Sequence, residues 1–159
     1  MDDVIKGIII GLIPSLIVSI LTARITVNLS IRQFRSQRWW ERKADMYSEL
    51  IKHLSIIQYC YGEWINDELM EYRKSDKEKQ KISKLYRESL DEFIMKCNES
   101  AYIVSEKAHN ALENIKREIE WEETTLNWFE DADNRYALVK ETIRELREYA
   151  REDLNVVEM

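Results

Sequence analysis

Residues that break helices are almost missing from this chain. Its 159 residues include three glycines and one proline, and beyond residue 31 only Gly62 remains. Because Gly and Pro are the residues that most often end helices and form turns, we expect long helices. Leu, Ile, Val and the aromatic residues recur with a helical period, although 34% of the residues are charged. The pattern predicts an all-α fold and argues against disorder.

The N-terminal segment is apolar and has no charge between Gly7 and Ala23. With the apolar residues on either side, it is long enough to cross a hydrocarbon core of about 30 Å. A cleaved signal peptide is the alternative interpretation. However, the apolar run is longer than the roughly 7–15 residues usual in such peptides, and it follows Asp2 and Asp3 rather than basic residues. The segment therefore predicts a retained transmembrane anchor over residues 1–31.

Small residues recur at four-residue spacing along this segment. In lipid, small side chains let helices approach closely, so the pattern predicts a homo-oligomer. If several copies surround an axis, the same residues would line a pore instead. The residues predicted for helix packing or pore lining are Gly7, Gly11, Ser15, Ser19, Thr22, Ala23 and Thr26.

Arginines follow the apolar segment. Because basic flanks are retained in the cytoplasm, they predict an inner-membrane protein with its N-terminus outside and residues 32–159 in the cytoplasm. We expect these side chains to contact lipid headgroups or to form the basic inner mouth of a pore. They are Arg24, Arg32, Arg35, Arg38 and Arg42.

The rest of the chain predicts a bundle of about four antiparallel helices. The first helix starts at the anchor, with which it can be continuous, and ends near residue 72. Ser75 and Glu78 have the spacing of a capping box that opens the second helix. A third helix follows Ser105 and carries an apolar stripe as far as Phe129. A turn at residues 131–134 then precedes a last helix that ends near Leu154.

A second basic run lies at the start of the second helix. It comprises Arg73, Lys74, Lys77, Lys79, Lys81, Lys84 and Arg87. A solvated turn is the ordinary interpretation, but a symmetric oligomer would repeat this charge and could bind a compact polyanion such as RNA or a cyclic oligonucleotide. Residues 44–159 as a whole hold 17 basic and 27 acidic groups, a net charge of −10. That charge argues against general nucleic-acid binding.

Motifs for catalysis or metal binding are missing from the sequence. The two histidines and two cysteines, His53, His109, Cys60 and Cys97, have no metal-ligand spacing. There is no nucleophile elbow and no phosphate-binding glycine loop. We therefore predict a non-enzymatic protein without a metal or cofactor.

The order of these parts resembles a known class of proteins. The residues concerned are the run from Arg38 to Leu50 after the anchor, the helix after Ser105, and the closing Arg147-x-x-x-Arg151-x-Asp153-Leu154. The chain is similar to small single-pass bacterial membrane proteins and, more loosely, to CRISPR-associated accessory membrane proteins of phage defence. Among these, the type VI-B accessory protein implies a membrane oligomer with a HEPN-like helical domain, and some type III effectors imply gating by cyclic oligoadenylate.

The ribonuclease part of that resemblance does not extend to this chain. HEPN ribonucleases have an Arg about four to six residues before a His, and neither His53 nor His109 has one there. The resemblance and the anchor together predict an oligomeric membrane effector that forms or gates a pore in antiviral defence, with a CRISPR effector complex, RNA or a cyclic oligonucleotide as candidate partner. The alternatives are a membrane-tethered scaffold that docks a cytoplasmic partner and a membrane sensor gated by a cyclic oligonucleotide.

Overall fold

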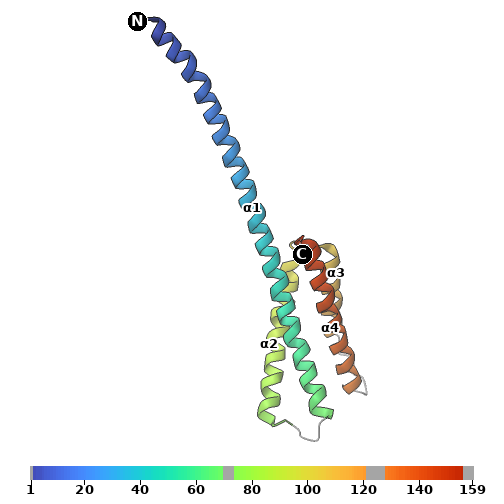
Figure 1. Ribbon diagram of the computed structural model, residues 1–159. Coiled ribbons are helices and arrows are strands. Elements are labelled where there is room, and N and C mark those ends of the chain that lie inside the picture. The colour runs from blue at the N-terminus through green and yellow to red at the C-terminus, as the bar shows by residue number, and fades with distance from the viewer. Residues whose placement is uncertain (1, 70–73, 121–127, 156–159) are drawn as a thin grey trace. The chain divides into compact units, whose positions relative to one another are not determined.

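Helices make up nearly all of the chain that the structure describes. The computed structural model describes residues 2–69, 74–120 and 128–155, with side chains from Val18 onward. These ranges contain four helices and no strand: α1 (Asp2–Leu69), α2 (Asp76–Ser100), α3 (Glu106–Glu120) and α4 (Trp128–Asp153) (Figure 1). The described chain is therefore all-helical, as its composition predicts.

The chain is divided into two compact units, residues 1–41 and residues 42–159. The first, which we call the N-terminal unit, consists of the N-terminal part of α1. The second, which we call the bundle, contains the rest of α1 together with α2, α3 and α4. The boundary lies within a continuous helix, so no loop in the sequence marks it.

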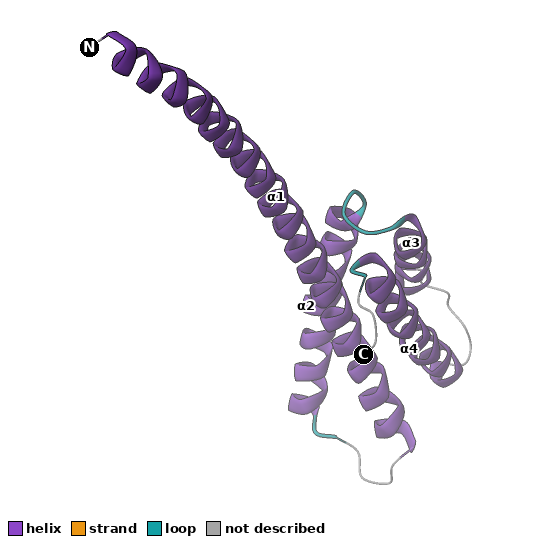
Figure 2. Ribbon diagram, turned by 45° about the horizontal axis from the view of Figure 1, so that its top comes forward, coloured by secondary structure: helices purple, strands orange, loops and turns teal. Residues whose placement is uncertain are grey.

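The helices of the bundle run antiparallel in chain order. Between α1 and α4, Tyr47 bonds to Asp153, and the ring of Tyr136 lies beside Gly62 fifteen residues further along α1. A residue later in α1 therefore contacts a residue earlier in α4, so these two helices are antiparallel. For α2 the direction is the same, because Cys60 pairs with Ile82 of α2 and Arg42 pairs with Tyr102, just after α2. For α3 and α4 it follows from the pairs Lys107 with Glu152 and Ile119 with Arg135 (Figure 2).

One hydrophobic core fills the bundle and draws on all four helices. Its fully buried members include Leu50, Leu54 and Ile57 of α1, Phe93 of α2, Leu112 and Ile115 of α3, and Val139 and Leu146 of α4. Each such side chain contributes about 1.5–3 kcal/mol when it leaves water. Among the residues whose side chains are described, none in the N-terminal unit belongs to this core.

Helix boundaries follow the sequence prediction in one place and depart from it in another. The predicted capping box is confirmed: the Ser75 hydroxyl accepts from the Glu78 amide, and the Glu78 carboxylate accepts from the Ser75 amide at 2.9 Å. The predicted turn at residues 131–134 is wrong, because α4 runs through it. There Asp131 pairs with Arg135 one turn later, at 2.9 Å, and Ala132 is buried in the core, so both residues stabilise the helix.

The prediction of a membrane-spanning helix is wrong. Over the residues that the structure describes, no helix combines the length and the apolar content needed to cross a membrane. The first described side chains, from Val18 to Arg35, already include Arg24 and Arg32 as well as Arg35. Each guanidinium group is costly in hydrocarbon. The predicted single N-terminal transmembrane helix, and with it the single-pass inner-membrane location and topology, is therefore withdrawn.

Candidate interaction surface

Most of the exposed large apolar side chains in the described chain lie on the N-terminal unit. Ten large apolar side chains there are 44–62% exposed: Val18, Ile20, Leu21, Ile25, Val27, Leu29, Ile31, Phe34, Trp39 and Trp40. Single exposed apolar residues are ordinary on a protein surface, whereas large exposed apolar patches are typical of surfaces that contact another molecule or a membrane.

The predicted small-residue stripe is described in part. Ser19, Thr22, Ala23 and Thr26 are all exposed on the N-terminal unit, and the Thr26 hydroxyl donates to the Thr22 carbonyl at 2.9 Å. The side chains of Gly7, Gly11 and Ser15 lie outside the described residues. A role of this stripe in helix packing or in lining a pore stays a prediction.

The predicted arginine face is divided among different surroundings. Arg24, Arg32 and Arg35 are exposed on the N-terminal unit. Arg38 places its guanidinium over the Phe34 ring, 4.7 Å from the ring centroid. Arg42 belongs to the bundle, where it donates to the Tyr102 hydroxyl at 2.7 Å. A role of these arginines in lipid contact or at the mouth of a pore stays a prediction.

Three members of the second basic run are paired with carboxylates within the bundle. Lys74 pairs with Glu63 at 3.2 Å and Lys79 with Asp67 at 2.8 Å, which ties the start of α2 to the end of α1. Lys84 pairs with Glu88 one turn along α2, at 3.6 Å. Lys77, Lys81 and Arg87 have no ion pair among the described residues, and Arg73 lies outside them.

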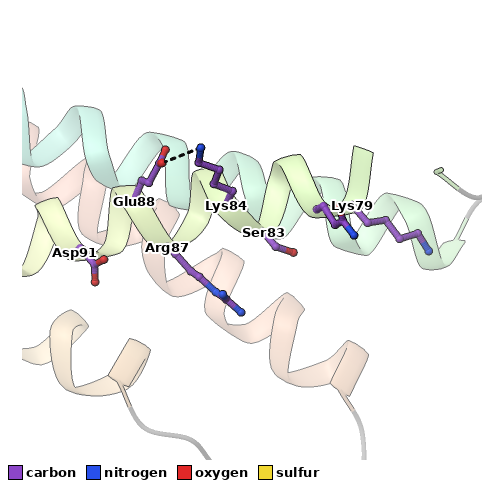
Figure 3. Close-up of a pocket in the computed structure, with 7 residues that line it drawn as sticks. Lys79, Ser83, Lys84, Arg87, Glu88 and Asp91 are labelled. Carbon is purple, nitrogen blue, oxygen red and sulfur yellow. Dashed lines mark ion pairs between the residues drawn. The ribbon is translucent and has the colours of Figure 1, made fainter. Parts of the chain in front are cut away.

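An open depression on α2 shows the same mixture of charges. It is lined by Lys79, Gln80, Ser83, Lys84, Arg87, Glu88 and Asp91. Figure 3 shows that Ser83, Arg87 and Asp91 point to one side of α2, while Lys84 and Glu88 face each other on another. Two carboxylates beside three basic groups weaken any attraction for a polyanion.

Asp67 organises the connection between α1 and α2. Its carboxylate accepts from the Lys74 amide at 2.6 Å and pairs with the Lys79 ammonium. These bonds favour the charged form, so the hydrogen bond from Lys79, followed by that from the Lys74 backbone, lowers the pKa of Asp67.

A polar junction joins three parts of the bundle at Asp153. The Asp153 carboxylate accepts from the Tyr47 hydroxyl of α1 at 2.5 Å and from the Ser105 amide, which precedes α3, at 2.9 Å. Lys43 lies 3.8 Å away. Burial, and then the bond to Asp153, raises the pKa of Tyr47 well above its usual range. The junction joins distant parts of the bundle, and no local sequence pattern indicates it.

An aromatic cluster anchors α1 to α2 further along the bundle. The Tyr61 and Tyr86 hydroxyls lie 3.0 Å apart, and the Trp64 ring packs 5.0 Å from that of Tyr86. Nearby on α4, Arg135 donates to the Ile119 carbonyl at the end of α3, at 3.0 Å. These groups hold helices together, and their arrangement indicates a structural role.

Cysteine and histidine side chains of the bundle do not form a reactive centre. Burial raises the pKa of Cys60 to about 11 and that of Cys97 to about 12. His53 lies 3.5 Å from Glu49, and the Nδ1 atoms of His53 and His109 are buried without a hydrogen-bond partner. Among the described residues, no group of three His, Cys, Asp or Glu side chains is placed to hold a metal ion.

No protein-family model matches this chain, and neither a curated protein nor a solved structure is detectably similar to it. The fold and the surfaces define an all-helical bundle whose first helix also carries exposed apolar side chains outside the bundle.

Proposed function

We propose that this protein is a non-enzymatic, self-associating helical scaffold. The N-terminal unit is the assembly element, and the bundle is the module that assembly brings together in several copies. The observation that carries the proposal is the run of ten exposed apolar side chains between Val18 and Trp40. Covering such a surface in water is favourable by about 25 cal/mol for each Å² of apolar area removed.

A second copy is the partner that fits this surface best. Aliphatic side chains dominate it, and an equally aliphatic surface is available on every other copy of the chain. The exposed apolar side chains of the bundle, such as Leu69, Met95 and Trp128, are in contrast scattered over different helices. The bundle is therefore a poorer complement to the N-terminal unit.

Two functions suggested by the sequence are not part of this proposal. Membrane permeabilisation required a spanning helix, which the described residues do not provide. Polyanion binding at the start of α2 is disfavoured because Lys74, Lys79 and Lys84 are already paired with carboxylates. A role in CRISPR-linked defence rests on the resemblance alone and stays a prediction.

Sedimentation equilibrium of the full chain tests the proposal. We expect a mass well above the 19.1 kDa of one chain at micromolar concentration. Replacing Leu21, Ile25, Val27 and Ile31 together by Gln should give the single-chain mass, because Gln maintains helix propensity while removing the apolar surface.

Matched substitutions on the bundle provide the control. Leu69→Gln with Met95→Gln changes exposed apolar residues outside the N-terminal unit, and this variant should keep the mass of the unaltered protein. A monomeric unaltered chain would contradict the proposal. So would an unchanged mass for the fourfold variant.

A further inference from the structure

The solvent-facing side of α2 carries its charges in two blocks. Every side chain of this helix is described, and basic residues are exposed in its first half and acidic residues in its second. At about 100° per residue, these positions lie within about 140° of the helix circumference, so they form one charged face. Its basic half comprises Lys77, Lys81, Lys84 and Arg87, and its acidic half comprises Glu88, Asp91, Glu92 and Glu99.

Few charges of the opposite sign interrupt the two halves. Among the described side chains of α2, no exposed residue from Glu88 onward is basic. Asp76 and Glu78 are exposed beside the basic half, but both belong to the first turn, where acidic groups complement the helix dipole. Lys84 pairs with Glu88 at 3.6 Å, yet these side chains are 77% and 62% exposed and stay accessible to a partner.

The charged face is complementary to a reversed copy of itself. Two parallel copies would place like charges side by side, which is unfavourable. Two antiparallel copies instead place the basic half of each against the acidic half of the other. If a two-fold axis lies between Arg87 and Glu88, residues equally far from the axis meet, so Lys84 of each copy faces Asp91 of the other.

We infer that the α2 helices of two copies pack face to face and antiparallel, with the basic half of each against the acidic half of the other. This inference rests on the proposed self-association and adds a second contact, between bundles, to the one through the N-terminal units. The same surface is used on both copies, so the contact is isologous and closes as a pair.

The contact between two charged faces is weak by itself. Exposed ion pairs each contribute little, because water already solvates the charges well. Two isolated bundles therefore do not stay paired at micromolar concentration. When the N-terminal units join several copies, an assembly presents several charged faces, and their contacts act together. The pairing is thus a property of the full chain.

Cross-linking with bismaleimidoethane, a short reagent that joins two thiols, tests the direction of the contact. Gln80 and Met95 are exposed on the charged face, carry no charge and lie equally far from the axis. Gln80→Cys chains co-expressed with Met95→Cys chains should give a cross-linked dimer, because the two introduced thiols meet. Either variant alone should give none, since its own two thiols lie about 22 Å apart across the pair.

The unaltered chain is the control for this reagent, because its thiols, Cys60 and Cys97, are buried. It should give no cross-linked dimer.

Reversing charges tests the cause of the contact in the same pair of cysteine variants. Lys81→Glu with Lys84→Glu in both chains should lower the cross-linked fraction at least about tenfold, because two-fold symmetry repeats each change and like charges then meet. Adding Asp91→Lys with Glu92→Lys reverses the second half as well and should restore the cross-link. Glu and Lys have similar helix propensities, so circular dichroism should be the same for all variants.

The outcomes separate this inference from the proposed function. The Lys81→Glu with Lys84→Glu variant should still sediment above the 19.1 kDa of one chain, because its N-terminal unit is unchanged. An oligomeric chain whose cysteine mixture gives no cross-link would contradict the inference and leave the scaffold standing. Cross-linking of Gln80→Cys chains alone, or no recovery after the second reversal, would also contradict it. A monomeric unaltered chain without cross-linking in the mixture contradicts both proposals.

Discussion

Asp153 connects parts of the bundle that lie far apart in the sequence, and its bond to Tyr47 can be removed by a single atom change. Tyr47→Phe deletes the hydroxyl that donates to the carboxylate at 2.5 Å and leaves the ring in the core. We expect the free energy of unfolding to fall by about 1–2 kcal/mol, because the carboxylate loses a bond that water replaces only in part. Urea unfolding followed by circular dichroism measures this change.

Tyr59→Phe is the matched control for that variant, since the Tyr59 side chain is exposed on the same helix. Its unfolding free energy should stay within about 0.5 kcal/mol of the unaltered value. Equal losses for the two variants would show that the Asp153 junction does not stabilise the bundle.

The two cysteines should react only slowly with thiol reagents in the folded protein. With pKa values of about 11 and about 12, Cys60 and Cys97 hold little thiolate at pH 8. Thiolate is the reactive form, and at pH 8 a thiol with a pKa of about 11 is ionised only about one part in a thousand. Both side chains are also fully buried. We expect slow reaction with Ellman's reagent in buffer and rapid reaction of both thiols in concentrated urea.

Rapid labelling in buffer would mean that the helices around the cysteines open frequently. A comparison of the labelling rate with the unfolding rate separates local opening from global unfolding. Labelling much faster than global unfolding would contradict the tightly packed core described for the bundle.

Contacts between single residues can be predicted from the sequence only when the partners are close together in the chain. The partners of Asp153 lie 106 and 48 residues away, so no local pattern indicates the junction. Ser75 and Glu78 are three residues apart, and their capping box could be predicted because the spacing itself brings the groups together.

At the scale of the helices, the stability that Asp67 gives to the connection between α1 and α2 should decrease in acid. The pKa of Asp67 is lowered in the folded state, so its contribution to stability is complete above the unfolded pKa, near 3.8, and is lost as the pH falls through the lower folded value. Asp67→Asn should therefore be less stable than the unaltered chain at pH 7, and the difference should shrink below about pH 4. Urea unfolding at pH 7, 5 and 3 measures both effects.

Asp91→Asn is the control, because Asp91 lines the open depression on α2 and has no ion pair among the described residues. Its stability should follow that of the unaltered chain at each pH. A constant difference between Asp67→Asn and the unaltered chain from pH 7 to pH 3 would contradict the role assigned to the carboxylate.

Element boundaries were predictable where local signals agreed with packing. The sequence indicated a turn at residues 131–134 because Asp and Asn favour turns. The turn does not form, because Asp131 pairs with Arg135 within α4 and Ala132 joins the core. An apolar stripe was expected to continue from α3 to Phe129, but α3 ends at Glu120 and Phe129 belongs to α4, because helical periodicity does not show where one helix ends and the next begins.

At the scale of the whole molecule, the bundle should fold without the N-terminal unit. All members of the buried core lie between Met46 and Leu146. A chain of residues 42–159 should therefore show the helical circular dichroism of the bundle, unfold cooperatively in urea and sediment as a monomer. If the fragment is oligomeric, the assembly surface lies on the bundle. If it is unfolded, the core of the bundle is not sufficient for folding without the N-terminal unit.

The candidate assembly surface was only half predictable. The apolar residues between Val18 and Phe34 are evident in the sequence, and the uncharged run from Gly7 to Ala23 that precedes and overlaps them is typical of a membrane helix. That these side chains stay exposed on α1 and outside the core of the bundle follows only from the structure. The small residues predict self-association by close helix packing, whereas the self-association that we propose uses the larger aliphatic side chains.

The Asp153 junction also has a consequence for the order of events during synthesis on the ribosome. Tyr47 precedes Asp153 by 106 residues, and at about 5–20 residues per second the carboxylate is made about 5–20 s later. During this interval the apolar residues of α1 lack the partners that α4 supplies. The nascent chain must therefore be shielded or remain loosely collapsed, and the bundle closes only after its last helix has left the exit tunnel.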